Sequence, residues 1–140
     1  MNLLSFEKIW EDDEVYGIEL IAESEFVKIK TKTYTYPEKI KELAEILLSY
    51  PQKKNDCFLW ENGIKGDGYT PYFSLEFKCN EYGHVEIEIY SEIEDGGLSK
   101  NHNCFFSVRS EIGLINKFGK SVLNMNSGGT GTKAEMKMFD

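Results

Sequence analysis

Two histidines and three cysteines are the residues best suited to nucleophilic or metal chemistry. His102 and Cys104 lie two positions apart, and His84, Cys57 and Cys79 lie elsewhere in the chain. A Cys-His pair can form an activated thiol, and both residue types are zinc ligands. The spacing matches no zinc motif, and Cys79 and Cys104 fall in apolar runs, where a free cysteine usually serves as a small core residue. We therefore predict no catalytic residue, metal or cofactor, and keep a small metal- or thiol-dependent enzyme using His84, His102 and Cys104 as the alternative.

Carboxylates and glycines offer two further kinds of site, and neither pattern is specific. Glu86 and Glu88 have the residue types of a glycosidase pair, but they stand on an open strand face with nothing to raise the pKa of one of them. Gly63, Gly66 and Gly68 follow neither the phosphate-loop nor the dinucleotide-binding pattern. We expect solvated carboxylates and an irregular loop.

The clearest pattern in the sequence runs from Tyr72 to Asp95 and predicts a β-hairpin. Apolar residues alternate with polar ones on both sides of a turn at residues 80–83, which contains Asn and Gly. Since alternate side chains lie on opposite faces of a strand, one face is apolar and the other carries Glu86, Glu88 and Glu92. Same-face neighbours are ~6.6 Å apart along a strand, so these glutamates form an acidic stripe.

The acidic stripe and a nearby loop provide the candidate partner-binding residues. Residues 61–71 hold three glycines and a proline, and long irregular loops are often functional. Tyr and Trp side chains are common anchors of interfaces, although these aromatics also suit the edge of a core. The predicted partner-binding residues are Glu86, Glu88, Tyr90, Glu92, Glu94, Asp95, Trp60, Asp67 and Tyr69.

A basic stripe on another predicted strand gives the acidic stripe a structural explanation. Lys28, Lys30 and Lys32 share one face of the strand predicted over residues 26–36. If this strand neighbours the hairpin, lysines and glutamates pair across the sheet, with a few tenths of a kcal/mol for each pair. The acidic stripe is then a structural feature and not an interface.

Length and charge restrict the class of protein. The chain has 140 residues, which suits a single domain, and a net charge of −8. This charge argues against nucleic acid or an anionic membrane as a direct ligand and would attract a basic protein, although it also serves solubility. Three cysteines without framework spacing, and no signal-like or membrane-spanning segment, predict a cytoplasmic protein.

The remaining pattern predicts an α+β domain. Residues 1–13 are expected to dock as a short helix or first strand, and strands are predicted near residues 15–22, 26–36, 57–60, 73–79, 85–93 and 103–109. Amphipathic helices are predicted at residues 37–49 and 110–123, the second capped by Ser110. We expect two layers, a mainly antiparallel sheet with both helices packed on one face, in a single domain of residues 1–123. Residues 124–140 are rich in Gly and Ser and predict a flexible tail, with a docked end at 136–139 as an option.

The segments YFSLEFKCNEYGHVEIEIY and CFFSVRSEIGLINKFGKSV together resemble small immunity proteins of bacterial polymorphic-toxin and contact-dependent growth-inhibition systems. The resemblance covers about residues 70–123 and lies in the succession of two strands, a Phe-rich strand and a helix. It implies a cognate toxin domain, often a nuclease, held inactive in a one-to-one complex. It supplies no catalytic residue.

These observations favour a binding protein. We predict an immunity protein that neutralises a toxin domain, a basic partner that meets the acidic surface, and a monomer or weak dimer without direct contact with nucleic acid or membrane. A self-associating structural domain that uses an uncovered sheet face or edge is a further alternative.

Overall fold

The computed structural model describes residues 1–66, 70–94 and 101–138 and folds them into eight strands and two helices. The elements are β1 (Asn2–Glu11), β2 (Tyr16–Glu23), β3 (Lys28–Thr35), α1 (Pro37–Leu48), β4 (Cys57–Asn62), β5 (Tyr72–Cys79), β6 (His84–Glu94), β7 (Asn101–Glu111), α2 (Ile112–Ser127) and β8 (Lys133–Met138).

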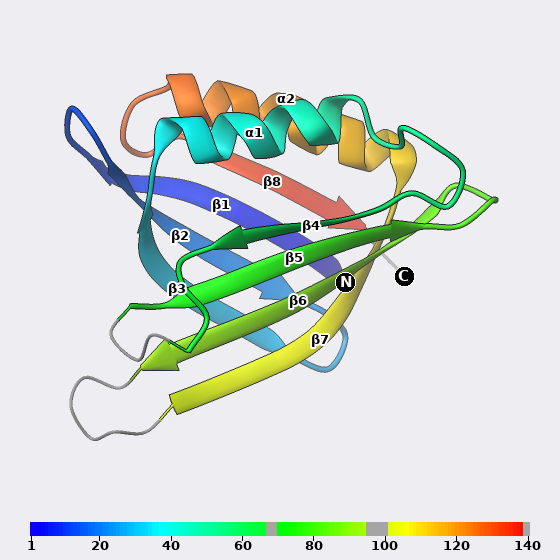
Figure 1. Ribbon diagram of the computed structural model, residues 1–140, viewed down its shortest axis with the longest axis horizontal. Coiled ribbons are helices and arrows are strands. Elements are labelled where there is room, and N and C mark those ends of the chain that lie inside the picture. Colours follow the sequence, from blue (N-terminus) through cyan, green and yellow to red (C-terminus); the bar gives the residue numbers. More distant parts are fainter. Residues whose placement is uncertain (67–69, 95–100, 139–140) are drawn as a thin grey trace.

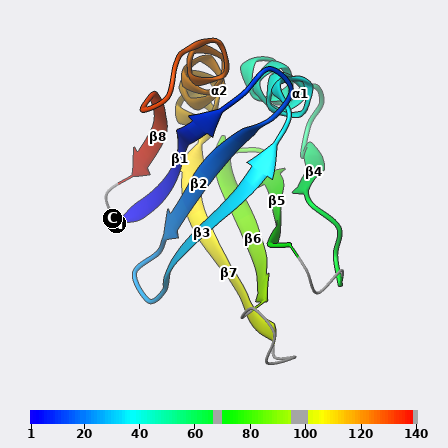
Figure 2. The same cartoon turned by 90° about the vertical axis from the view of Figure 1, so that its left-hand side faces the viewer.

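The strands form two antiparallel sheets of four strands each. The first sheet has the order β3-β2-β1-β8 and the second has the order β4-β5-β6-β7. The sheets face each other, and the two helices lie side by side across one end of the space between them (Figure 1). Figure 2 shows α2 on the side of β8 and α1 on the side of β4. The predicted α+β class, with antiparallel pairing and two amphipathic helices, is confirmed; the strand pattern did not indicate that the strands divide between two sheets.

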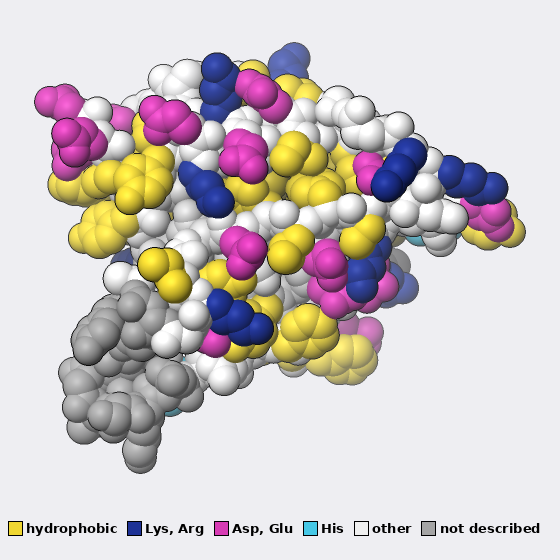
Figure 3. All heavy atoms as spheres, in the orientation of Figure 1, with side chains coloured by type: hydrophobic (Ala, Val, Ile, Leu, Met, Phe, Trp, Pro, Cys, Tyr) yellow, Lys and Arg dark blue, Asp and Glu magenta, His cyan; other side chains and the backbone are white. Residues whose placement is uncertain are grey.

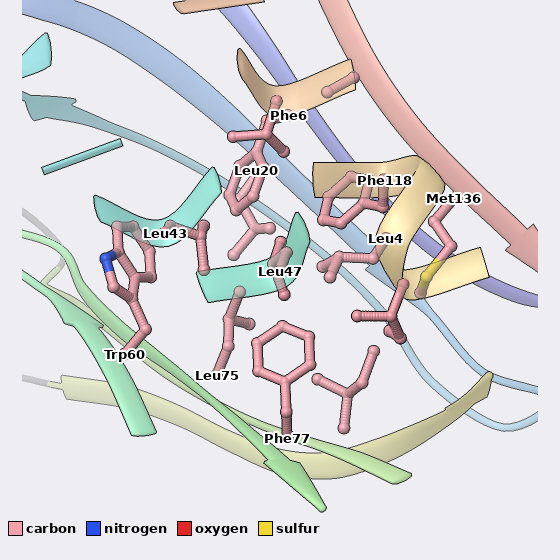
Figure 4. Close-up of a cluster of buried hydrophobic side chains, with 14 of the residues drawn as sticks. Leu4, Phe6, Leu20, Leu43, Leu47, Trp60, Leu75, Phe77, Phe118 and Met136 are labelled. Carbon is pink, nitrogen blue, oxygen red and sulfur yellow. The ribbon is translucent and has the colours of Figure 1, made fainter. Parts of the chain in front are cut away.

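The hydrophobic core fills the space between the sheets and the helices. Leu4 and Phe6 of β1, Leu75 and Phe77 of β5, and Phe118 of α2 are fully or almost fully buried and point toward a common centre (Figure 4). The ring centroids of Phe6 and Phe118 lie 5.9 Å apart. Burial of each such side chain contributes about 1.5–3 kcal/mol, so this cluster fixes the helices against both sheets.

Both ends of the chain belong to the first sheet. Residues 1–13, expected as a short helix or strand, form β1, which pairs with β2 on one side and β8 on the other. The prediction of a flexible tail over residues 124–140 is wrong for the part that the structure describes. Residues 124–127 complete α2, and the alternating segment KAEMKM forms β8, with Ala134 and Met136 buried. The alternative prediction, a docked end at residues 136–139, is correct for Met136, whereas Phe139 lies outside the described residues.

The helix ends agree in part with the sequence pattern. Pro37 opens α1 as predicted, but Ser110 does not cap α2. Ser110 is buried at the end of β7, where its hydroxyl lies 3.2 Å from the sulfur of Met136, and Glu111 precedes the helix without a side-chain capping bond. The sequence does not distinguish a serine whose side chain caps a helix from one whose side chain fills a gap between elements.

One of the two glycines in α2 is explained by close helix packing. A Cβ atom at Gly119 would lie 2.8 Å from both the Cβ of Leu47 and the backbone nitrogen of Leu48. Only a hydrogen at this position lets α2 approach α1 so closely. Gly113 would meet no atom within 4 Å, so packing does not explain that glycine.

A buried lysine joins β1 to the end of α2. The Nζ atom of Lys8 donates hydrogen bonds to the carbonyl oxygens of Asn126 (3.0 Å) and Gly128 (2.6 Å). It also lies 3.4 Å from a carboxylate oxygen of Glu11 and 4.4 Å from the centroid of the Tyr16 ring. A cation at a helix C-terminus meets the negative end of the helix dipole and binds carbonyl groups that lack partners in the helix.

Candidate partner-binding surface

The predicted hairpin is present and forms the middle of the second sheet. β5 and β6 pair in register, with Leu75 opposite Ile89 and Phe77 opposite Ile87. The side-chain oxygen of Asn80 accepts hydrogen bonds from the backbone nitrogens of Tyr82 and His84, which closes the turn. The apolar residues face the core, and the alternate residues therefore face away from it.

We call the solvent-facing side of β4, β5, β6 and β7 the outer face. Its members follow from the register of the three strand pairs, and neither helix covers it (Figure 1). They are Cys57, Leu59, Glu61, Tyr72, Ser74, Glu76, Lys78, Glu86, Glu88, Tyr90, Glu92, Asn103, Phe105, Ser107 and Arg109.

The acidic stripe lies on this outer face, and a lysine compensates part of its charge. Lys78, on the neighbouring strand, donates a short hydrogen bond to Glu88, and its Nζ atom lies 3.5 Å from an oxygen of Glu76. Glu88 is the largest cause of a raised pKa for Lys78. Glu86 is exposed and accepts a hydrogen bond of 2.9 Å from the hydroxyl of Ser107. Figure 3 accordingly shows acidic, basic and hydrophobic side chains interspersed on this side.

The far end of the stripe is tied to the loop that follows β4. The Tyr90 hydroxyl donates to one oxygen of Glu92, and the backbone nitrogen of Gly66 donates to the other at 2.9 Å. The bond from Tyr90, followed by the bond from Gly66, holds the pKa of Glu92 below its usual range. The Nζ atom of Lys65 lies 4.9 Å from the centroid of the Tyr90 ring. Glu92 and Tyr90 are therefore engaged within the protein and are less available to a partner than Glu86.

The structure places only some of the predicted partner-binding residues together. Glu86, Glu88, Tyr90 and Glu92 come together on the outer face as predicted. Glu94 ends β6, and nothing is described of its side chain, while Asp67, Tyr69 and Asp95 lie outside the described residues.

The prediction for Trp60 is wrong. Its side chain is 2% exposed, packs with its ring centroid 5.7 Å from that of Phe73, and donates from Nε1 to the carbonyl oxygen of Lys39 in α1. Trp60 is opposite Leu75 in the strand register and therefore belongs to the core side of the sheet. The suggested alternative, an aromatic residue of the core, is the correct one for this residue.

Two exposed apolar residues on the outer face were not predicted. Phe105 is 63% exposed and Leu59 is 53% exposed, and they lie on β7 and β4 respectively. The alternation in the segment CFFSV already opposes Phe105 to Phe106, whose side chain faces the core. Since one of two adjacent phenylalanines in a strand must face away from the core, this was the available signal.

The lysine stripe does not pair with the acidic stripe. Lys28, Lys30 and Lys32 lie on β3, at an edge of the first sheet, whereas the acidic stripe is in the second. The Nζ atoms of Lys30 and Lys32 lie 3.7 and 3.8 Å from an oxygen of Glu19 on the adjacent strand. The structural explanation that the two stripes neutralise each other is therefore wrong.

The histidines and cysteines of the alternative enzyme do not form one site. His84 begins β6, and His102 is opposite Ile93 near the other end of that strand, roughly 30 Å away at about 3.3 Å per residue. Cys104 packs against the core. Desolvation and the neighbouring Glu76 raise the pKa of the Cys57 thiol, which opposes formation of a reactive thiolate.

The described residues hold no cluster of metal ligands and no helix suited to a bilayer. Within residues 1–66, 70–94 and 101–138, no three His, Cys, Asp or Glu side chains come together in a way that could hold a metal ion. In the same part of the chain, neither helix has the length and apolar composition needed to span a bilayer. Comparison of the chain with protein-family models, with curated proteins and with solved structures found no match.

Proposed function

We propose that this chain is an immunity protein of a bacterial toxin system, which binds a cognate toxin domain, in our proposal a nuclease, and keeps it inactive in the cytoplasm. The observation that carries the proposal is the outer face, an uncovered sheet surface on which Glu76, Glu86 and Glu88 lie between the exposed apolar residues Leu59 and Phe105. Interfaces commonly combine apolar anchors with complementary charge in this way.

In this proposal the outer face covers the basic substrate-binding region of the toxin. Nucleases bind phosphates through Lys and Arg, and the net charge of −8 would accelerate the encounter with such a surface. Glu86 is exposed and accepts a hydrogen bond from a neutral hydroxyl, and Lys78 and Arg109 stand opposite it on the two neighbouring strands. A cation of the partner would join these two side chains at Glu86. Glu88 is already bonded to Lys78, so a partner gains less from it.

The first experiment is affinity capture from a lysate of the native cells at low and at moderate salt, followed by mass spectrometry. The captured protein is then purified, and its nuclease activity and its inhibition of growth are measured with and without the immunity protein. We expect a single stoichiometric basic partner, whose activity falls when the complex forms.

Charge reversal on the outer face tests the surface. Glu86→Lys and the double variant Glu86→Lys, Glu88→Lys are compared with a double variant of the same charge change on the exposed side of α1, Glu42→Lys and Glu45→Lys. We expect weaker binding and a smaller salt dependence for the first two variants and a small effect for the control. If all variants bind equally, or if the captured partner stays active in the complex, the proposal fails.

A further inference from the structure

The four edge strands of the two sheets differ in how they are protected. β3 carries three exposed lysines, and β8 carries two lysines and a glutamate. β4 is six residues long, and its Trp60 side chain is bonded to α1. β7 is eleven residues long, and its first eight residues, NHNCFFSV, include no Lys, Arg, Asp or Glu. Proteins usually protect edges with charges, short strands or covering elements, so β7 has the features of an edge that accepts another strand.

The direction of the backbone groups on β7 can be assigned from one contact. The backbone nitrogen of Arg109 donates to the side-chain oxygen of Asn2, at 2.9 Å, and therefore points away from β6. Because backbone groups alternate in direction along an antiparallel strand, those of Asn103, Phe105 and Ser107 also point to the open edge. Asn2 closes the edge at Arg109, and within residues 1–66, 70–94 and 101–138 no bond from another element is found to the outward backbone groups of Asn103, Phe105 and Ser107.

A hollow lies beside this edge. It is lined by the turn between β2 and β3, including Phe26 and Val27, and by Phe106, Ser107 and Arg109 of β7. Phe26 is 87% exposed, and the Ser24 hydroxyl accepts bonds from the backbone nitrogens of Phe26 and Val27, which fix the turn. The side chains of an added strand would alternate between this hollow and the outer face beside Phe105.

We propose that the open edge of β7 binds an extended segment of the partner protein, in which apolar and basic residues alternate. The inference deepens the proposed function and rests on it for the nature of the partner. Main-chain bonds to Asn103, Phe105 and Ser107 would hold the segment, and the hollow would accept its apolar side chains. Ser107 is small and lies beside Glu86 and Glu88, so a long cationic side chain opposite it reaches these carboxylates, alongside Lys78 and Arg109.

Charge favours a foreign segment over a second copy of this chain. A second β7 placed on the first would bring the uncharged segment 101–108 and only Arg109 beyond it as a cation, and each copy carries a net charge of −8. The partner that fits both the open edge and the adjacent carboxylates is therefore basic.

The test uses the full chain and a short synthetic peptide of alternating valine and lysine, with a peptide of the same composition in two blocks as the control. Amide hydrogen exchange by NMR is measured first on the free protein. We expect the amides of Asn103, Phe105 and Ser107 to exchange faster than those of Cys104 and Phe106, which pair with β6. The alternating peptide should protect the three outward amides and bind at least about tenfold more tightly than the block peptide.

Two variants separate strand addition from general attraction to an acidic protein. Ser107→Pro removes an outward N–H that β6 does not use, so the ladder with β6 is retained, while the ring obstructs an added strand. We expect about tenfold weaker binding of the alternating peptide, with Ser107→Thr as the matched control. Phe105→Lys, at an exposed position, should weaken binding by a similar factor and covers the case in which the proline variant does not fold.

Each outcome supports or overturns the proposal. Peptide binding that leaves exchange at Asn103, Phe105 and Ser107 unchanged overturns it, and so does equal binding of both peptides. A dimer in sedimentation velocity that Ser107→Pro dissociates would assign the edge to a second copy and also overturns it. If the peptide binds as expected but capture yields no toxin, strand addition is supported and the immunity function is overturned. If a toxin is captured and neutralised but binds the Ser107→Pro variant as tightly as the original chain, the immunity function is supported and strand addition is overturned.

Discussion

Replacing Lys8 by methionine tests the buried contact between β1 and the end of α2. Methionine keeps most of the apolar stem and removes the ammonium group, so the carbonyl groups of Asn126 and Gly128 lose their charged donor. Two charge-assisted bonds contribute about 1.5–3 kcal/mol each. Relief of the buried charge offsets part of this loss. We expect the free energy of unfolding to fall by about 3 kcal/mol.

Urea unfolding, followed by far-UV circular dichroism, measures this loss. The midpoint should fall while the slope m stays constant, because the variant removes a contact and not a folded element. Lys41→Met is the matched control. Lys41 is exposed on α1, with its Nζ atom 3.9 Å from an oxygen of Glu45, so this variant should cost less than about 0.5 kcal/mol.

A Lys8→Met variant as stable as the Lys41→Met control would contradict this expectation. Desolvation of the ammonium group would then cancel its bonds to the helix end, and Lys8 would contribute to the fold only through its stem. A lower slope m would also contradict the expectation, because it would indicate that the end of α2 is already unfolded before the transition.

Three further predictions concern the packing and electrostatics of other elements. Gly119→Ala should destabilise the protein by about 1–3 kcal/mol despite the better helix propensity of alanine, because its Cβ would clash with α1. Gly113→Ala, with open space around it, should stabilise the protein by up to about 1 kcal/mol. Equal effects of the two variants in thermal unfolding would contradict the close packing of the helices at Gly119. Met136→Ala should lower the free energy of unfolding by about 3 kcal/mol, and Lys137→Ala, at an exposed position, by less than about 0.5 kcal/mol. Similar values for the two variants in chemical denaturation would show that β8 contributes nothing to the core. The pKa of Glu92 is depressed, first by the bond from the neighbouring tyrosine hydroxyl, so its stabilisation is present above its ordinary pKa of 4.5 and is lost as the pH falls through the folded value. Glu92→Gln should therefore flatten the decline of stability below pH 4.5, and identical pH profiles would show that these bonds do not contribute.

Local patterns in the sequence were sufficient for the elements and for part of the surface. The hairpin of β5 and β6 was predicted correctly because its alternation and its turn residues lie within one short segment. The same alternation placed Glu86, Glu88 and Glu92 together, and Pro37 marked the beginning of α1.

The division of the strands between two sheets could not be predicted, because strand patterns specify a buried face and not a neighbouring strand. This is why Lys30 and Lys32 were assigned to the acidic stripe, although Glu19 is their partner. Trp60 was misassigned for a related reason. The sequence of a short strand does not show which of its two faces packs against the core and which faces solvent.

The C-terminal segment shows how composition can conceal a pattern. Gly128, Gly129 and Gly131 suggested a flexible tail, but they form a short connection between α2 and β8. The alternation of Ala134 and Met136 with charged residues was present, but it is only six residues long. A strand this short is specified mainly by its partner, β1, which is distant in the sequence.

The pairing of β1 with β8 has a consequence for the order of folding during synthesis. Residue 2 is paired with residue 138, so β1 leaves the ribosome long before β8, its second neighbour in the sheet, has been made. The hairpin of β5 and β6, by contrast, involves contacts close in sequence and can form early. Until β8 is added, β1 presents an open edge beside Leu4 and Phe6, and an interrupted translation product would carry this aggregation-prone edge. We therefore expect a chain that ends before β8 to be more prone to aggregation and proteolysis than a chain that includes it.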